Sequence, residues 1–245
     1  MTPLTVTRHG RVAVLTLEHP ENGNRLDRDM ADAVTVALQA ARTDAAIGAC
    51  VVTGFGEIFC LGGDYQGAGP TAAGRAEYAD ALIGMDRALA HLGKPLVCAV
   101  NGDAHAGGLS VVIGCDLAVA SADATFGLPE AANGLFPFLT LAIVKDALPK
   151  KALFDLIYNA RLLTAQEALD LRIVNEVAPR RRPRARNRAR RAGRSSQRGN
   201  RHARPRPLLR HARLGTDGRT RSSACCTTCR ARGEGSNSER EIALR

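Results

Sequence analysis

The chain is poor in aromatic residues: only 4% of its 245 residues are Phe, Tyr or Trp, and tryptophan is absent. Alanine, valine, leucine and isoleucine must therefore fill the core of a chain that is 45% hydrophobic. No aromatic residue follows Tyr158, so the C-terminal part lacks the rings on which nucleic-acid bases stack. No apolar run approaches the ~20 residues that a membrane helix needs. These shortages argue against a membrane protein and against a base-stacking nucleic-acid binder.

The N-terminus has no basic start followed by an apolar stretch, so no secretory signal is expected. Cys50, Cys60, Cys98 and Cys115 lie in apolar runs or beside glycines, which is typical of buried free thiols. We therefore expect a protein of the reducing cytoplasm.

Charge divides the chain near residue 180. Residues 1–179 hold 13 Lys and Arg against 20 Asp and Glu, whereas residues 180–245 hold 21 Arg, no Lys and 4 acidic residues. The overall charge of +10 and the pI of 9.8 therefore come from the C-terminal segment alone. We expect a mildly acidic domain over 1–179 and a separate arginine-rich tail over 180–245.

The tail has no sustained apolar period, and its composition cannot offset the entropy of ordering, so disorder is predicted. Its arginines would bind phosphates in a salt-dependent way, which leaves open a nucleic-acid-binding function. Cys226 and Cys229 resemble half a zinc site but lack a second ligand pair at a suitable spacing, so no metal site is predicted. GC-rich coding sequence read in a shifted frame would also yield this composition.

Before residue 180, apolar runs and helical periods alternate, which predicts an α/β fold. The strands are expected near residues 4–7, 12–17, 50–53, 95–100, 115–121 and 124–127. The helices are expected after Asp27 and near residues 76–92, 109–114, 139–148, 150–158 and 164–171. Asp27 and Thr164 are placed to cap helices, and Asp64 is expected to cap the helix that follows it.

Two glycine-rich turns each follow a predicted strand. The first reads Phe59-Cys60-Leu61-Gly62-Gly63-Asp64, and the second runs from Asn101 to Gly108. Glycine lets a backbone N–H approach a substrate closely, and a helix that starts there adds a positive dipole end. We expect Gly63 and Gly107 to direct two N–H groups at one oxygen, forming an oxyanion hole.

One carboxylate, Glu130, follows Phe126-Gly127-Leu128-Pro129 and precedes the apolar residues 134–138. Desolvation in such surroundings raises the pKa of a carboxyl group toward neutrality. Glu130 is therefore a candidate for proton transfer.

These motifs resemble the crotonase superfamily, the enoyl-CoA hydratase/isomerase family, over residues 1–179; residues 180–245 do not match. The resemblance also rests on Asn24 to Leu26, Cys115-Asp116-Leu117 and matches between 162 and 177. It implies a spiral of ββα turns that binds an acyl-CoA, with Gly63 and Gly107 on the thioester oxygen and Glu130 as the acid/base. Coenzyme A would arrive with the substrate, and no other cofactor is implied.

The resemblance implies further substrate contacts around these groups. They come from Asn24, Arg25, Leu61, Gly62, Asp64, Ala106, Gly108, Ser110 and Pro129. In the family, C-terminal helices that residues 180–245 do not match mediate trimer contacts. Those trimers commonly pair as hexamers. The resemblance therefore implies a homotrimer or hexamer only for a chain that carries those helices.

Ser110 departs from the family, whose hydratases usually carry a second glutamate at this position, three residues after the second oxyanion glycine. Hydration is easiest with two carboxylates, whereas moving a proton between carbons needs one. We expect an enoyl-CoA hydratase of acyl-CoA breakdown. A close alternative is a 3-enoyl to 2-enoyl-CoA isomerase that uses Glu130 alone. Two further alternatives are an inactive relative of the family and a protein that binds nucleic acid through its basic tail. His105 or Asp103 would replace the missing glutamate if either faced the pocket.

Overall fold

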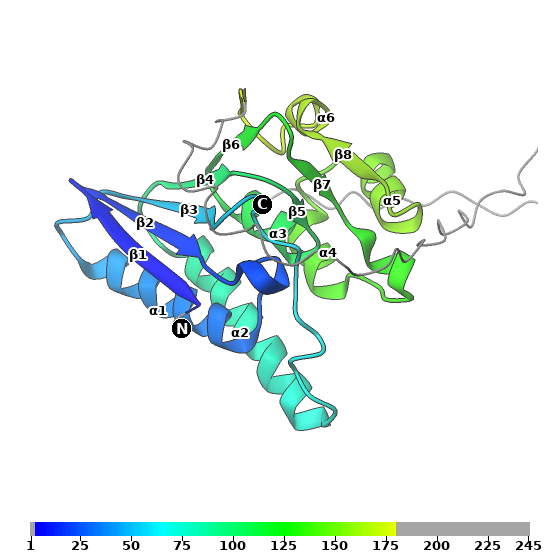
Figure 1. Ribbon diagram of the computed structural model, residues 1–245, viewed down its shortest axis with the longest axis horizontal. Coiled ribbons are helices and arrows are strands. Elements are labelled where there is room, and N and C mark those ends of the chain that lie inside the picture. The colour runs from blue at the N-terminus through cyan, green and yellow to red at the C-terminus, as the bar shows by residue number, and fades with distance from the viewer. Residues whose placement is uncertain (1–2, 180–245) are drawn as a thin grey trace, which may run out of the picture. The chain divides into compact units, whose positions relative to one another are not determined.

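The computed structural model describes residues 3–179, and the expectations for residues 180–245 lie outside them. The described chain forms two β-sheets with helices packed against them (Figure 1). The strands of the larger sheet are, in spatial order, β1 (Leu4–His9), β2 (Val12–Leu17), β3 (Ala49–Gly54), β4 (Leu96–Val100), β6 (Leu117–Ser121) and β9 (Glu176–Ala178). The smaller sheet contains β5 (Ala104–His105), β7 (Thr125–Gly127) and β8 (Leu162–Thr164).

The described α-helices are α1 (Arg28–Thr43), α2 (Ala72–Ala90), α3 (Gly107–Gly114), α4 (Phe138–Val144), α5 (Lys150–Tyr158) and α6 (Ala165–Asp170). Two short 3₁₀ helices are η1 (Pro20–Asn22) and η2 (Pro129–Asn133). Helices α1 and α2 lie side by side along one face of the β1–β3 part of the larger sheet (Figure 1).

The larger sheet is parallel apart from its first strand. β1 and β2 form an antiparallel hairpin, and β2, β3, β4, β6 and β9 then pair in parallel. Burial alternates along β2, β3 and β4, so one face of each strand is covered while the other is partly exposed. Parallel neighbours need long crossovers, and the helices supply them.

The chain winds through both sheets in successive turns. β4 is followed by β5 of the smaller sheet and then by α3, and β6 is followed by β7, η2 and α4. After β3, Cys60 makes a parallel bridge to Ala104 of β5 before the chain reaches α2. This repetition is the expected spiral of ββα turns.

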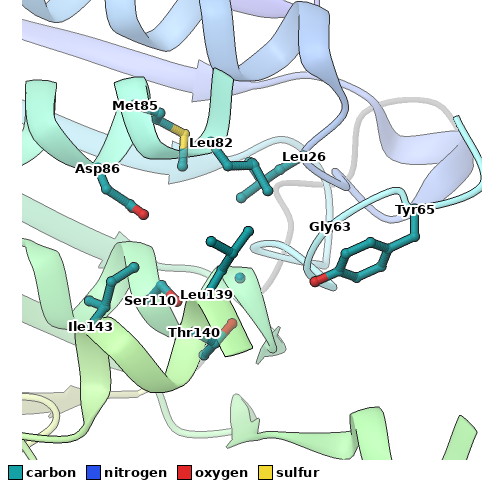
Figure 2. A pocket seen from close by; sticks show the side chains of 11 residues that line it. Leu26, Gly63, Tyr65, Leu82, Met85, Asp86, Ser110, Leu139, Thr140 and Ile143 are labelled. Atoms are coloured by element: carbon teal, nitrogen blue, oxygen red, sulfur yellow. The ribbon is translucent and has the colours of Figure 1, made fainter. Parts of the chain in front are cut away.

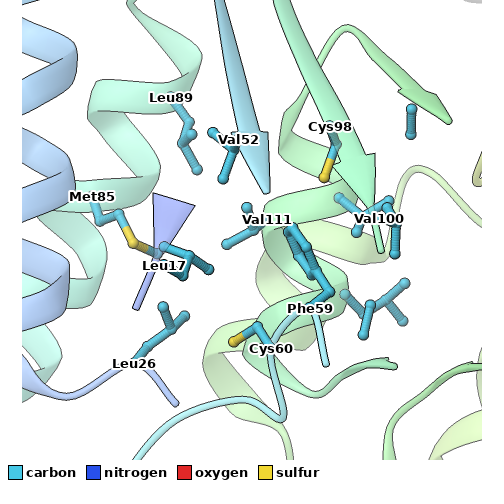
Figure 3. Close-up of a cluster of buried hydrophobic side chains, with 14 of the residues drawn as sticks. Leu17, Leu26, Val52, Phe59, Cys60, Met85, Leu89, Cys98, Val100 and Val111 are labelled. Carbon is cyan, nitrogen blue, oxygen red and sulfur yellow. The ribbon is translucent and has the colours of Figure 1, made fainter. Parts of the chain in front are cut away.

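The core lies between the larger sheet, α2 and α3 (Figure 3). Leu17, Val52 and Val100 come from strands and meet Met85 of α2 and Val111 of α3 (Figure 3). Aliphatic residues and cysteines fill most of this volume, as the shortage of aromatics requires.

The first helix begins where the sequence predicts. The Asp27 side chain accepts a hydrogen bond from the Met30 N–H at 2.7 Å and so caps α1. The apolar stripe of α1 then buries Met30, Val34 and Leu38. The predicted capping of α6 is also confirmed, because the Thr164 hydroxyl accepts from the Glu167 N–H.

Two local expectations were wrong. The second helix starts at Ala72 rather than near residue 76, because Thr71 caps it by accepting from the Gly74 N–H at 3.0 Å. Asp64 therefore caps no helix; its side chain accepts from the Gly67 N–H at 3.1 Å within a turn. The short strands β5, β8 and β9 were not expected, since two or three residues carry no periodic signal.

Candidate active site

The two glycine turns lie against each other. A Cβ atom added at Gly107 would lie 3.5 Å from the backbone nitrogen of Gly63. Among residues 3–179, no group accepts a hydrogen bond from the N–H of Gly63 or Gly107. Gly107 is also the first residue of α3, so the positive end of that helix adds to its N–H. The pair can therefore donate to one oxygen placed between the turns.

Close backbone packing fixes these turns. Ala106 has φ +52°, an uncommon conformation for a residue with a side chain, and its N–H donates to the Gly127 carbonyl at 2.9 Å. Its Cβ would lie 2.5 Å from a Cβ at Gly62, which itself has φ +99°. A Cβ at Gly108 would lie 2.2 Å from the Cys60 carbonyl oxygen. Side chains at Gly62 and Gly108 would therefore push the turns apart.

Arg25 and Asn24 support the first turn. The Arg25 guanidinium donates to the carbonyls of Leu61 at 2.8 Å and Gly63 at 3.4 Å. The buried Asn24 amide donates to the carbonyls of Phe55 and Ile58 at 3.0 and 2.8 Å. These contacts hold the chain on both sides of Gly63 and leave the orientation of its N–H defined.

A cavity of about 20 Å³ lies beside the two glycines (Figure 2). Its apolar walls are Leu26, Leu82, Met85, Leu139 and Ile143. Its polar lining consists of Tyr65, Asp86, Ser110 and Thr140. Gly63, Gly107 and Ser110 of the sequence-predicted set therefore line one space.

Glu130 lies in η2 and is 5% exposed. Neither of its carboxylate oxygens has a hydrogen-bond partner within the described residues. Burial raises the pKa of Glu130, and its own backbone N–H opposes that shift without completing a hydrogen bond. Glu130 is not part of the cavity wall, but it lies close enough to Tyr65 that its charge adds to burial in raising the pKa of that phenol.

The other sequence candidates lie around this space rather than on it. Leu61, Gly62, Ala106 and Gly108 belong to the two turns, and Asn24, Arg25, Asp64 and Pro129 lie outside the cavity wall.

His105 and Asp103 both contact Thr125 instead of the cavity. His105 Nε2 is 2.8 Å from the Thr125 hydroxyl, which donates to Asp103 at 2.7 Å. Neither His105 nor Asp103 is therefore placed to replace the second glutamate. At the position of that glutamate, Ser110 lines the cavity.

Asp86 is the carboxylate among the cavity residues that sequence reasoning missed. It lies on α2, and burial raises its pKa to about 6. The signal was present: Asp86 follows Leu82 by four residues and precedes Leu89 by three, so it falls inside the buried stripe of the helix. A carboxylate within an apolar stripe indicates a group kept for a purpose other than packing.

No described helix is both long and apolar enough to cross a membrane. Within residues 3–179, no three His, Cys, Asp or Glu side chains are gathered as metal ligands would be.

A family model described as enoyl-CoA hydratase/isomerase matches residues 7–202, which extends past residue 179, where we expected the resemblance to end. A putative enoyl-CoA hydratase of Thermus thermophilus is 35% identical over 174 residues, covering 69% of this chain and 69% of that protein. The 2,3-dehydroadipyl-CoA hydratase of Escherichia coli is 32% identical over 181 residues, covering 73% and 70%. The crystal structure of a Mycobacterium smegmatis enoyl-CoA hydratase superposes with a TM-score of 0.70 at 29% identity, covering 73% and 70%.

Proposed function

The chain belongs to the enoyl-CoA hydratase/isomerase family, and from that membership we propose that it adds water to a 2-enoyl-CoA. One observation carries the proposal: the N–H groups of Gly63 and Gly107 donate no hydrogen bond within the described residues, and both glycines line one cavity. Relatives named as enoyl-CoA hydratases support the same reaction class.

The glycine pair would bind the thioester oxygen. As water adds to C3, electron density moves through C2 onto that oxygen, and an enolate develops. Two fixed N–H donors and the N-terminal end of α3 stabilise this negative charge without having to reorganise. Loss of one such donor typically costs about 3 kcal/mol of transition-state stabilisation.

Glu130 would deliver the proton to C2. Because burial raises its pKa, the protonated form is more populated near neutral pH than it would be in water. The carboxylate left behind is buried and unpaired, which favours recapture of a proton. The same group would remove the C2 proton in the reverse direction. The reaction needs no resident cofactor, since coenzyme A is part of the substrate.

An isomerase is the second candidate, and Ser110 is the observation that favours it. With serine at this position, α3 supplies no second carboxylate. Glu130 alone could take a proton from C2 of a 3-enoyl thioester and return it to C4, which shifts the double bond into the 2-position.

The two candidates separate in a paired assay of crotonyl-CoA hydration and 3-hexenoyl-CoA isomerisation. Hydration should be the faster reaction, and Glu130→Gln should abolish both. Glu176→Gln, at an exposed position on β9, is the matched control and should leave both rates unchanged. Isomerisation without hydration would favour the second candidate, and wild-type rates in Glu130→Gln would refute the role of Glu130 in either.

A further inference from the structure

Asp86 and Ser110 occupy one end of the cavity. Figure 2 shows the Asp86 carboxyl group directed from α2 toward Ser110 and Ile143, with Gly63 and Tyr65 at the other end. Within residues 3–179, the Asp86 carboxylate accepts no hydrogen bond and forms no ion pair. Its side-chain neighbours on the cavity wall include Leu82 and Met85, which offer it no donor.

The Ser110 hydroxyl is buried, at 4% exposure for the residue, and lacks a hydrogen-bond partner among the described groups. Ser110 lies three residues after Gly107 on α3, so both face the same side of that helix. Because an unpaired buried hydroxyl is unfavourable, the Ser110 hydroxyl on a cavity wall that also carries the partly buried Asp86 carboxylate indicates a polar occupant between them.

The cavity has the size of that occupant. A volume of about 20 Å³ exceeds the 10–15 Å³ that one water requires. A buried water also needs two to four polar partners, and Asp86, Ser110 and the nearby Thr140 hydroxyl can provide them.

We propose that Asp86 and Ser110 bind the water that hydration consumes, and that Asp86 is the base that accepts its proton. This assignment rests on the proposed hydratase function. Asp86, on α2, thus supplies the second carboxylate that is missing from α3, where Ser110 takes the place of a glutamate.

The step balances with the groups present. The water oxygen forms a bond to C3 while one of its protons passes to the Asp86 carboxylate. The C2–C3 π electrons move to the enolate held by the two glycines, and protonated Glu130 then transfers its proton to C2. Asp86 afterwards releases its proton to solvent and Glu130 takes one up, so one water is consumed in each turnover.

The protonation state of Asp86 agrees with its role as a base. Burial raises the pKa of Asp86 to about 6, so the carboxylate form predominates at pH 7 and can accept a proton. Burial also raises the pKa of Glu130, and neither of its carboxylate oxygens has a hydrogen-bond partner within the described residues.

The test compares Asp86→Asn and Ser110→Ala with Asp80→Asn, an exposed aspartate on the same helix, in the full chain. Two reactions are measured: hydration of crotonyl-CoA, and exchange of C2 protons of butanoyl-CoA with deuterium oxide. Exchange needs the glycines and Glu130 but no water addition.

Asp86→Asn should lower kcat for hydration by about 10²- to 10⁴-fold, the usual contribution of a general base. Its C2 exchange should stay within about twofold of wild type. Ser110→Ala should lower hydration by about tenfold, as expected for one lost hydrogen bond to the reacting water. Asp80→Asn should match wild type in both reactions.

Normal hydration by Asp86→Asn would overturn the Asp86 assignment and leave the hydratase function intact. A loss of C2 exchange together with hydration would also overturn it, because the side chain would then support the site as a whole. A wild-type chain that exchanges C2 protons but hydrates nothing would instead refute the hydratase function.

Discussion

The backbone nitrogen of Gly63 lies 3.5 Å from the position that a Cβ atom would take at Gly107. The two residues are far apart in sequence, yet each contributes an N–H that donates to no described group. Any side chain at Gly107 would therefore enter the space in which both N–H groups would meet a substrate oxygen.

Gly107→Ala should lower kcat of the proposed reaction by about 100-fold, since one donor would be displaced or blocked. The added methyl would lie 3.3 Å from the Leu26 side chain, which can shift slightly, so the thermal midpoint should change little. Steady-state kinetics and thermal denaturation measure the two effects.

The control for this change is Gly84→Ala, on α2. A Cβ there meets nothing within 4 Å, and alanine favours a helix over glycine by about 1 kcal/mol. This variant should be more stable than wild type and equally active. Equal activity in Gly107→Ala would contradict the oxyanion role of this glycine.

Asp86→Asn should stabilise the fold at high pH and have little effect at low pH. Burial raises the pKa of Asp86 from 3.8 to about 6, so ionisation costs folding free energy once the pH rises through that range. Below the unfolded pKa the group is protonated in both states and the cost vanishes. Denaturant titration at pH 3 and pH 8 should show a gain of up to about 2 kcal/mol at pH 8 only. A gain of equal size at both values would mean that the carboxylate is not desolvated.

The rate of hydration should rise with pH through about 6 as Asp86 loses its proton. Tyr65 is the other ionisable group on the cavity wall, and because its pKa is raised it does not titrate in that range. A profile of kcat/KM should therefore carry an acidic limb in wild type that is missing in Asp86→Asn. The same limb in both proteins would assign it to another group that acts in its deprotonated form, and would contradict the role of Asp86 as the base.

Asp27→Ala should lower the free energy of unfolding by about 1 kcal/mol, because the Met30 N–H loses its acceptor at the start of α1. Asp29→Ala is the control: Asp29 is exposed in the first turn of the same helix. Chemical denaturation of the two variants should differ accordingly. Similar losses would mean that helix-dipole charge, rather than the cap, stabilises this end.

Local signals in the sequence were sufficient to predict the first strands and two of the helix starts. The hairpin of β1 and β2, the apolar strands β3 and β4, and the caps at Asp27 and Thr164 each depend on residues close together in the chain. The start of α2 was misplaced because Gly74, which lies in its first turn, is typical of a loop. Asp64 is also an acceptable cap, and only the path of the backbone places it in a turn instead.

The sequence by itself determined which groups could do chemistry: the glycines at Gly63 and Gly107, whose missing side chains admit a substrate oxygen, and a carboxylate at Glu130 among apolar residues. Only the tertiary structure decided which of them share a space. The packing of α2 beside α3 brings Asp86 to the cavity that Ser110 lines. The contact of Thr125 with His105 and Asp103 directs those two side chains elsewhere. Such placements depend on long-range packing, which no periodicity within one segment encodes.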